Sequence, residues 1–191
     1  MAKLFMANTS NIFEMKFGRP QTVLLTKEMP NGAIVTLGDT MEKTSRELDH
    51  CHAVTEEAMT SVIGKFIIVA PEINAQQYRT IDGQMGKFVL EANETYSAYM
   101  LSKYDRIEYS DAYIKDATGV QVGDKLNVTT PVAGTGERFA KASGGCLRVV
   151  SIVDLWLPVM LAPNTTAGQG AKNPAKLMPA SCKMYKVEVE K

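Results

Sequence analysis

The chain has no excess of charge and few residues of the kinds that bind metals or form disulfides. Its 191 residues contain 21 Lys and Arg against 21 Asp and Glu, with only two His, three Cys and one Trp. A net charge of zero excludes the summed positive field with which many proteins attract polyanions, and no local cluster of Lys and Arg replaces it. We therefore expect neither a nucleic acid nor a membrane as a partner.

Long apolar runs are also absent. No run approaches the roughly 20 residues of a membrane-spanning helix, and residues 1–10 contain only a short apolar patch, well short of the core of a signal peptide. Cys51, Cys146 and Cys182 are odd in number, widely spaced and without a C-x-x-C pair. These features predict a protein made in the cytoplasm, with three reduced and mostly buried thiols.

Recognisable catalytic motifs are missing as well. The sequence has no G-x-S-x-G elbow, and its Gly-rich stretches lack the spacing of phosphate-binding loops. His50 and His52 lie on a predicted strand, where alternate side chains point the same way, so they are weak candidates for a shared metal. We predict no cofactor and no enzyme activity. The alternative is a metal-dependent β-barrel enzyme that uses His50, His52 and a loop carboxylate.

The sequence contains instead many short runs of β-branched and aromatic residues, separated by Gly, Pro, Asn and Asp. Residues 66–70 form an apolar run that ends at Pro71, residues 147–157 form the longest, and residues 184–190 alternate cleanly between apolar and charged. This pattern predicts a mainly β fold. We expect a small β-barrel or sandwich with long loops, one or two short helices and an extended N-terminal arm.

Local signals predict several details of this fold. Residues 23–25 and 33–37 are predicted to pair as a hairpin around the Pro-Asn-Gly turn at residues 30–32. A helical turn is expected at residues 55–61, an exposed loop at residues 131–145, and a half-exposed terminal strand at residues 184–190.

We expect residues 1–20 to form the arm and residues 21–191 a single β-rich domain, which would subdivide, if at all, near residues 130–145. Aromatic residues concentrate on the arm and between residues 96 and 113. Tyrosine gives interfaces a large, rigid contact at low entropic cost, although the same rings also suit a sheet core. The candidate partner-binding residues are Phe5, Phe13, Phe17, Tyr96, Tyr99, Tyr104 and Tyr109.

The order of features between residues 65 and 128 resembles a known family. The features are Ile-Val-Ala-Pro-Glu-Ile at residues 68–73, Phe88-x-x-Glu91-Ala92, Ala-Tyr-Met-Leu at residues 98–101, and a Gly-Asp pair before a strand. Together they resemble the capsid decoration (head-stabilising) proteins of tailed phages of Gram-positive bacteria. The chain departs from that pattern in an inserted loop at residues 74–80 and in lacking a Gly after Ala92.

The resemblance implies a structural virion protein without a cofactor, made in the host cytoplasm and located on the capsid surface. Such a protein is a homo-oligomer that binds the major capsid protein lattice and stabilises the mature shell by linkage. The arm, the terminal strand and the loops would be its contacts, with edge strands adding to a partner sheet. The alternative within this class is another virion part, a tail or head-fibre protein.

Overall fold

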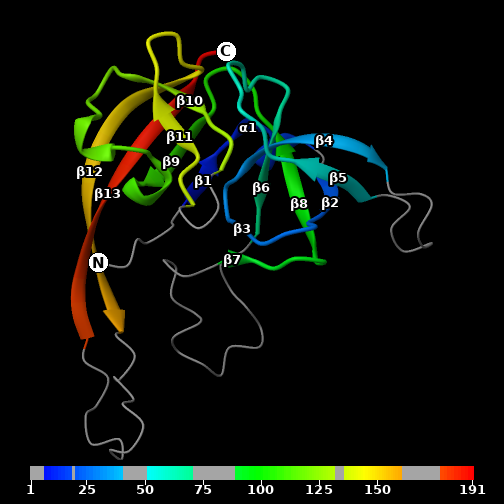
Figure 1. Ribbon diagram of the computed structural model, residues 1–191, viewed down its shortest axis with the longest axis horizontal. Helices are drawn as coiled ribbons and strands as arrows, with labels where there is room; N and C mark the ends of the chain where they lie inside the picture. The colour runs from blue at the N-terminus through cyan, green and yellow to red at the C-terminus, as the bar shows by residue number, and fades with distance from the viewer. Residues whose placement is uncertain (1–6, 19, 41–50, 71–88, 132–135, 161–176) are drawn as a thin grey trace, which may run out of the picture.

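The computed structural model describes most of the chain, and its regular structure is mainly β-strand (Figure 1). The described residues are 7–18, 20–40, 51–70, 89–131, 136–160 and 177–191, and for residues 16, 17, 156–160 and 177–181 only the backbone is described. The mainly β prediction is confirmed. Among the described residues, no helix combines the length and the apolar character needed to span a membrane.

In chain order the elements are β1 (Ala7–Asn11), α1 (Phe13–Phe17), β2 (Gln21–Leu24), β3 (Met29–Pro30), β4 (Ile34–Thr40), β5 (Cys51–Thr55), β6 (Phe66–Val69), β7 (Val89–Leu90), β8 (Thr95–Met100), β9 (Arg106–Ser110), 3-10 turns at Asp111–Tyr113 and Ala117–Gly119, β10 (Lys125–Val128), β11 (Phe139–Lys141), β12 (Leu147–Met160) and β13 (Leu177–Val189).

Five strands close into a barrel in the order β2-β5-β4-β6-β8. β2 runs parallel to β5, and the other neighbours are antiparallel. The two-stranded sheet of β3 and β7 adds Met29 and Leu90 to the barrel core. Strand β6 faces two cores, since Ile68 packs inside the barrel and Ile67 packs outside it. Because successive strand side chains point to opposite faces, this explains why the β6 sequence is apolar throughout.

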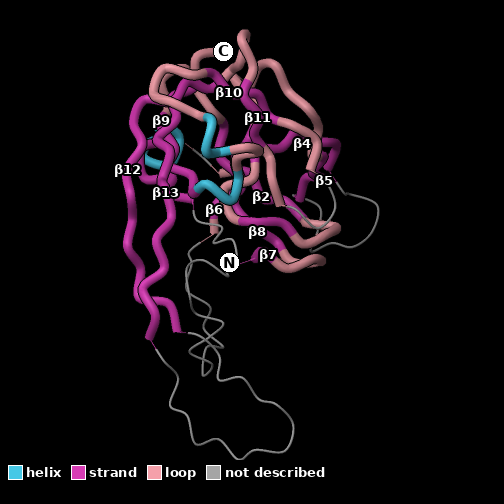
Figure 2. The backbone as a smooth tube through the Cα atoms, turned by 60° about the vertical axis from the view of Figure 1, so that its left-hand side comes forward, coloured by secondary structure: helices cyan, strands magenta, loops and turns pink. Residues whose placement is uncertain are grey.

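The second sheet has six strands in the order β1-β9-β13-β12-β10-β11, and all neighbours are antiparallel. β10 pairs with β12 only at Leu147 and Arg148, the first two residues of β12. On the other side of the sheet, β9 pairs with β13 only from Met184 onward. Residues 154–160 and 177–183 therefore continue as a two-stranded ribbon without a further strand in the described part of the chain. Figures 1 and 2 show this ribbon projecting away from the body.

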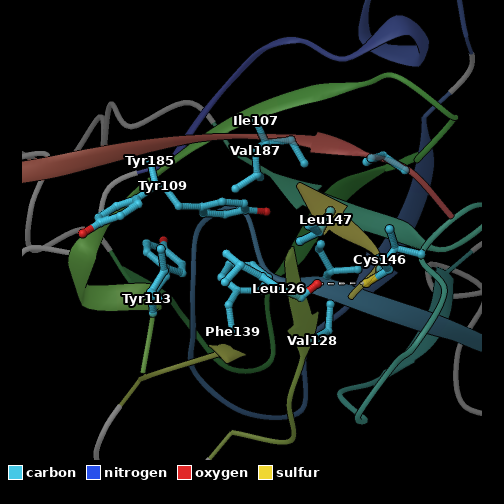
Figure 3. Packing of buried hydrophobic residues seen from close by; sticks show 14 of the residues in the cluster. Ile107, Tyr109, Tyr113, Leu126, Val128, Phe139, Cys146, Leu147, Tyr185 and Val187 are labelled. Atoms are coloured by element: carbon cyan, nitrogen blue, oxygen red, sulfur yellow. Dashed lines mark hydrogen bonds between the residues drawn. The ribbon is translucent and has the colours of Figure 1, made fainter. Parts of the chain in front are cut away.

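The main core lies between the barrel and the six-stranded sheet, and aromatic rings fill much of it (Figure 3). The ring of Tyr109 lies 4.6 Å from that of Phe139 and 5.0 Å from that of Tyr113, measured between centroids. These spacings are typical of favourable aromatic pairs. The three cysteines are free and buried, as predicted.

Two buried tyrosine hydroxyl groups fasten the sheet to the barrel. Tyr109 donates a hydrogen bond to the carbonyl of Gly32 at 2.9 Å, and Tyr113 donates one to the carbonyl of Asn31. The side chain of Asn31 in turn bonds the backbone N–H and C=O of Ala70 at 3.0 and 3.1 Å. Burial raises the pKa of Tyr109 well above its ordinary value, so its hydroxyl stays protonated and remains a donor.

The outer face of the six-stranded sheet carries charged side chains. Glu188 on β13 lies between Arg106 on β9 and Arg148 on β12, at 2.8 and 3.0 Å. The hydrogen bond from Arg106, followed by that from Arg148, lowers the pKa of Glu188 below its ordinary value. On the opposite face Val187 and Val189 are fully buried, but Glu188 is only 5% exposed because its two arginine partners cover it, so the predicted half-exposed character of this strand is wrong.

Several local predictions are wrong because long-range pairing overrides them. The predicted hairpin does not form, since β2 pairs with β5 and β8 whereas β4 pairs with β5 and β6. Residues 55–61 contain no helical turn, and Met59 instead bridges to Val128. The predicted exposed loop contains β11, where Phe139 is buried and Arg138 pairs with Glu56 at 2.8 Å. The terminal strand β13 lies inside the sheet, so between Met184 and Glu188 it has no free edge for strand addition.

The predicted N-terminal arm includes structure that packs on the chain itself. β1 pairs with β9, and Ile12 is fully buried in the main core. Residues 1–6 lie outside the described residues, so an arm there stays a prediction.

Candidate protein-binding surface

Four exposed apolar side chains belong to segments that meet where β8 leads into β9. Phe13, Ile63, Met100 and Tyr104 are 59, 45, 39 and 65% exposed. Backbone hydrogen bonds join their segments: Gly64, next to Ile63, donates to the carbonyl of Leu101 at 2.9 Å. We call these four residues the Phe13–Tyr104 patch. Exposed apolar side chains that gather in this way are typical of protein-binding surfaces.

Asp105 positions both aromatic members of the patch. Its side chain is almost fully buried, and its carboxylate accepts hydrogen bonds from the backbone N–H of Phe13 at 2.8 Å and of Ser102 at 2.7 Å. The first bond attaches the start of α1 to the β8–β9 turn, and the second closes that turn. Because Tyr104 precedes Asp105 in the chain, one buried carboxylate fixes the backbone beneath both rings.

The backbone of Tyr104 is strained. Its φ angle is +72°, in the left-handed region, which costs a bulky L-residue roughly 1–2 kcal/mol. The neighbouring backbone enforces this conformation, because Tyr104 donates to the carbonyl of Val189 at 2.8 Å and Val189 donates to the carbonyl of Asp105 at 2.9 Å. The ring stays largely exposed, with the ammonium of Lys103 5.1 Å from its centroid. Strain kept at an exposed residue is characteristic of functional sites.

The structure separates the predicted partner-binding residues. Phe13 and Tyr104 are exposed and lie in the same patch, whereas Tyr109 is fully buried in the main core. Tyr96 and Tyr99 are half-buried, and the hydroxyl of Tyr96 accepts a hydrogen bond from the backbone of Glu91. Phe5 and the side chain of Phe17 lie outside the described residues.

The predicted histidine pair is described only in part. His52 lies on β5, and its Nδ1 is 3.0 Å from the carbonyl oxygen of Gly38. His50 lies outside the described residues. Within the described ranges, His, Cys, Asp and Glu side chains do not gather in groups of three that could hold a metal ion.

Sequence reasoning missed Ile63, Met100 and Asp105. Asp105 carried one usable signal, since Asp three positions along from Ser102 suits a tight turn. Its bond to Phe13, however, joins residues 92 positions apart, and nothing local indicates it.

A second surface borders the base of the ribbon. It is an open groove of about 720 Å³ beside β1, and its walls are mostly apolar. Val153, 58% exposed, and Met184 contribute to it from the ribbon side, and Val69 and Ala70 contribute from the barrel side.

No family model, curated protein or solved structure matches the chain. The interpretation of both surfaces therefore depends on the geometry of this chain.

Proposed function

We propose that the chain is a structural virion protein that binds the outer surface of a tailed-phage capsid and stabilises the mature shell. In this proposal the Phe13–Tyr104 patch is the surface that contacts the major capsid protein lattice. The resemblance over residues 65–128 supports the identity of the partner. The observation that supports a binding surface is Tyr104, a bulky exposed residue in a left-handed conformation that a smaller residue would adopt more easily.

The patch rests on a rigid base, which suits tight recognition. Ile12, next to Phe13, is fully buried, and Leu101, next to Met100, is 1% exposed. Asp105 adds its two backbone hydrogen bonds between these segments. Little conformational entropy then remains to be lost when a partner covers the exposed rings.

The mechanism is mechanical. A protein that binds the mature lattice, and binds the immature lattice weakly or not at all, stabilises the mature state by the free energy of that binding. A lattice repeats its sites, so many copies add modest contributions. A homo-oligomer would engage several sites at once and gain avidity.

The test is co-sedimentation of the purified protein with mature and with immature capsids. We expect binding to mature capsids, and we expect Tyr104→Asn to weaken it at least tenfold. Asn tolerates the left-handed region, so this variant should keep or slightly raise the free energy of unfolding. The matched control is Val122→Asn, because Val122 is 62% exposed outside the patch.

Two results would contradict the proposal. Wild-type protein that binds neither form of capsid would refute decoration, and binding to isolated tails or head fibres would favour the other virion role. If Tyr104→Asn and Val122→Asn bound capsids as tightly as wild type, the patch would not be the contact surface.

A further inference from the structure

The ribbon carries only two charged residues, and they lie opposite each other. Its strands read Asp-Leu-Trp-Leu-Pro-Val-Met at residues 154–160 and Leu-Met-Pro-Ala-Ser-Cys-Lys at residues 177–183. The register pairs Asp154 with Lys183 at the base of the ribbon. The remaining twelve residues carry no charge and are mostly apolar, which is unusual for strands that project from the body.

Asp154 and Lys183 are both exposed. Opposite charges that face each other across an antiparallel pair usually attract. In the described part of the chain, however, neither residue forms an ion pair with the other or with any third residue. Among the described residues, neither charge is neutralised by the chain itself.

The edges of the ribbon do not suit strand addition. Pro158 lies directly opposite Pro179, and proline has no N–H to donate. Within sheets proline occupies positions where the missing N–H would point to an edge, so it blocks further pairing there. An isolated two-stranded ribbon is only marginally stable in water. A partner that stabilises the ribbon would therefore pack against one of its faces rather than along its edges.

The two faces differ. The groove is lined by Val153, Leu155 and Met184. Asp154 and Lys183 do not line it, because their pair lies between the Val153–Met184 pair and the pair formed by Leu155. Since successive side chains of a strand point to opposite faces, the charged row lies on the face away from the groove.

We propose that a second copy of this chain covers the ribbon face that carries Asp154 and Lys183, in a two-fold symmetric contact. A two-fold axis makes a surface self-complementary, so Asp154 of one copy meets Lys183 of the other, and the reverse contact forms at the same time. The two-fold axis that makes both contacts runs along the strands, so the two ribbons lie face to face in the same direction. The uncharged ends of the two ribbons then cover each other.

The size of this face sets the strength of the contact. Seven residues at about 3.3 Å each, across two strands about 4.8 Å apart, give a face of roughly 200 Å². Stable interfaces bury about 800 Å² on each partner. A face well below this size gives a weak contact, so we expect the dimer only at high protein concentration. This self-association does not depend on capsid binding, although a lattice would strengthen it by holding copies close together.

The test is sedimentation equilibrium of the full chain between 5 and about 500 µM, a range chosen from the small contact area. The variants are Asp154→Lys, Lys183→Asp and the double exchange, with Val153→Ser on the groove face as the matched control. Circular dichroism establishes that each variant is folded. Wild type and Val153→Ser should dimerise alike, whereas either single exchange places like charges together at both contacts and weakens the dimer at least tenfold.

Mixing the two single variants gives the decisive measurement. In a mixed dimer each Lys meets an Asp, so an equimolar mixture of Asp154→Lys and Lys183→Asp should dimerise although neither variant does so alone. The double exchange should also restore the dimer. Wild type that stays monomeric at the highest concentration, single variants that dimerise normally, or a mixture that stays monomeric would each overturn the proposal. None of these measurements involves capsids, so their failure would leave the capsid-binding proposal standing.

Discussion

Replacing Asp105 by Ala should destabilise the fold by about 2–4 kcal/mol. Its carboxylate accepts two backbone hydrogen bonds, from Phe13 and Ser102, and the residue is 4% exposed. A buried donor that loses its partner costs about 1–3 kcal/mol. Two such losses together would cost about 2–6 kcal/mol. Phe13 is largely exposed, so water can partly replace its lost bond, and we therefore expect a value in the lower part of this range. Asp105→Asn keeps one acceptor oxygen and should cost about half as much.

The measurement is chemical denaturation at pH 7. A shift of the unfolding midpoint reports the change in stability, provided that the slope of the free energy of unfolding against denaturant concentration is the same in both proteins. The control is Asp124→Ala, which also removes an acceptor from a turn, where Asp124 accepts from the N–H of Gln121 at 2.8 Å. Asp124 lies at a more exposed position, so the loss should be clearly smaller. A change of less than about 0.5 kcal/mol for Asp105→Ala, the range of ordinary surface substitutions, would refute the view that this carboxylate holds the patch together.

Two further predictions concern the sheet and its core. Because Arg106 lowers the pKa of Glu188, Glu188→Gln should lower the free energy of unfolding at neutral pH, and its difference from wild type should fade as the pH falls below about 4.3, where glutamate in the unfolded chain becomes protonated. Denaturation between pH 7 and pH 3 measures this, and a difference independent of pH would contradict it. Tyr109→Phe leaves the buried carbonyl of Gly32 without its donor and should cost about 1–2 kcal/mol. Tyr104→Phe, the exposed counterpart, should change the stability by less than about 0.5 kcal/mol, and equal effects of the two variants would argue against the hydroxyl bond as a link between sheet and barrel.

Local composition was enough to predict the strands that carry a clear apolar pattern. The apolar runs in β6 and at the start of β12, and the alternating C-terminal strand, carry a period of two or a continuous apolar stretch. These patterns depend only on neighbouring residues, which is why they could be recognised. The pairing of the strands depends on distant segments. For this reason the hairpin predicted around the Pro-Asn-Gly turn was wrong. Asn31 uses its side chain to extend β6 rather than to close a hairpin.

The candidate surface was predictable only in part for the same reason. Phe13, Tyr104 and Tyr109 were all selected because aromatic residues suit interfaces, but Tyr109 is fully buried. Sequence alone does not separate them, since all three lie in or beside short extended segments. Long-range contacts separate them. The Asp105 carboxylate accepts from the backbone N–H of Phe13 beside Tyr104, whereas the hydroxyl of Tyr109 donates to the carbonyl of Gly32 inside the core.

The ribbon shows most clearly what an apolar sequence can and cannot indicate. Residues 147–157 form the longest apolar run of the sequence, and the first part of this run is buried, with Leu147 and Val149 in the main core. Farther along, the same strand leaves the sheet, and Val153 is 58% exposed although the sequence has not become more polar. An apolar sequence indicates that a segment is buried, but it does not indicate which part of the chain or which other molecule buries it. Val153 lies on the groove face, which the proposed dimer leaves uncovered, so its exposure marks the groove as an apolar surface separate from the charged face of the ribbon.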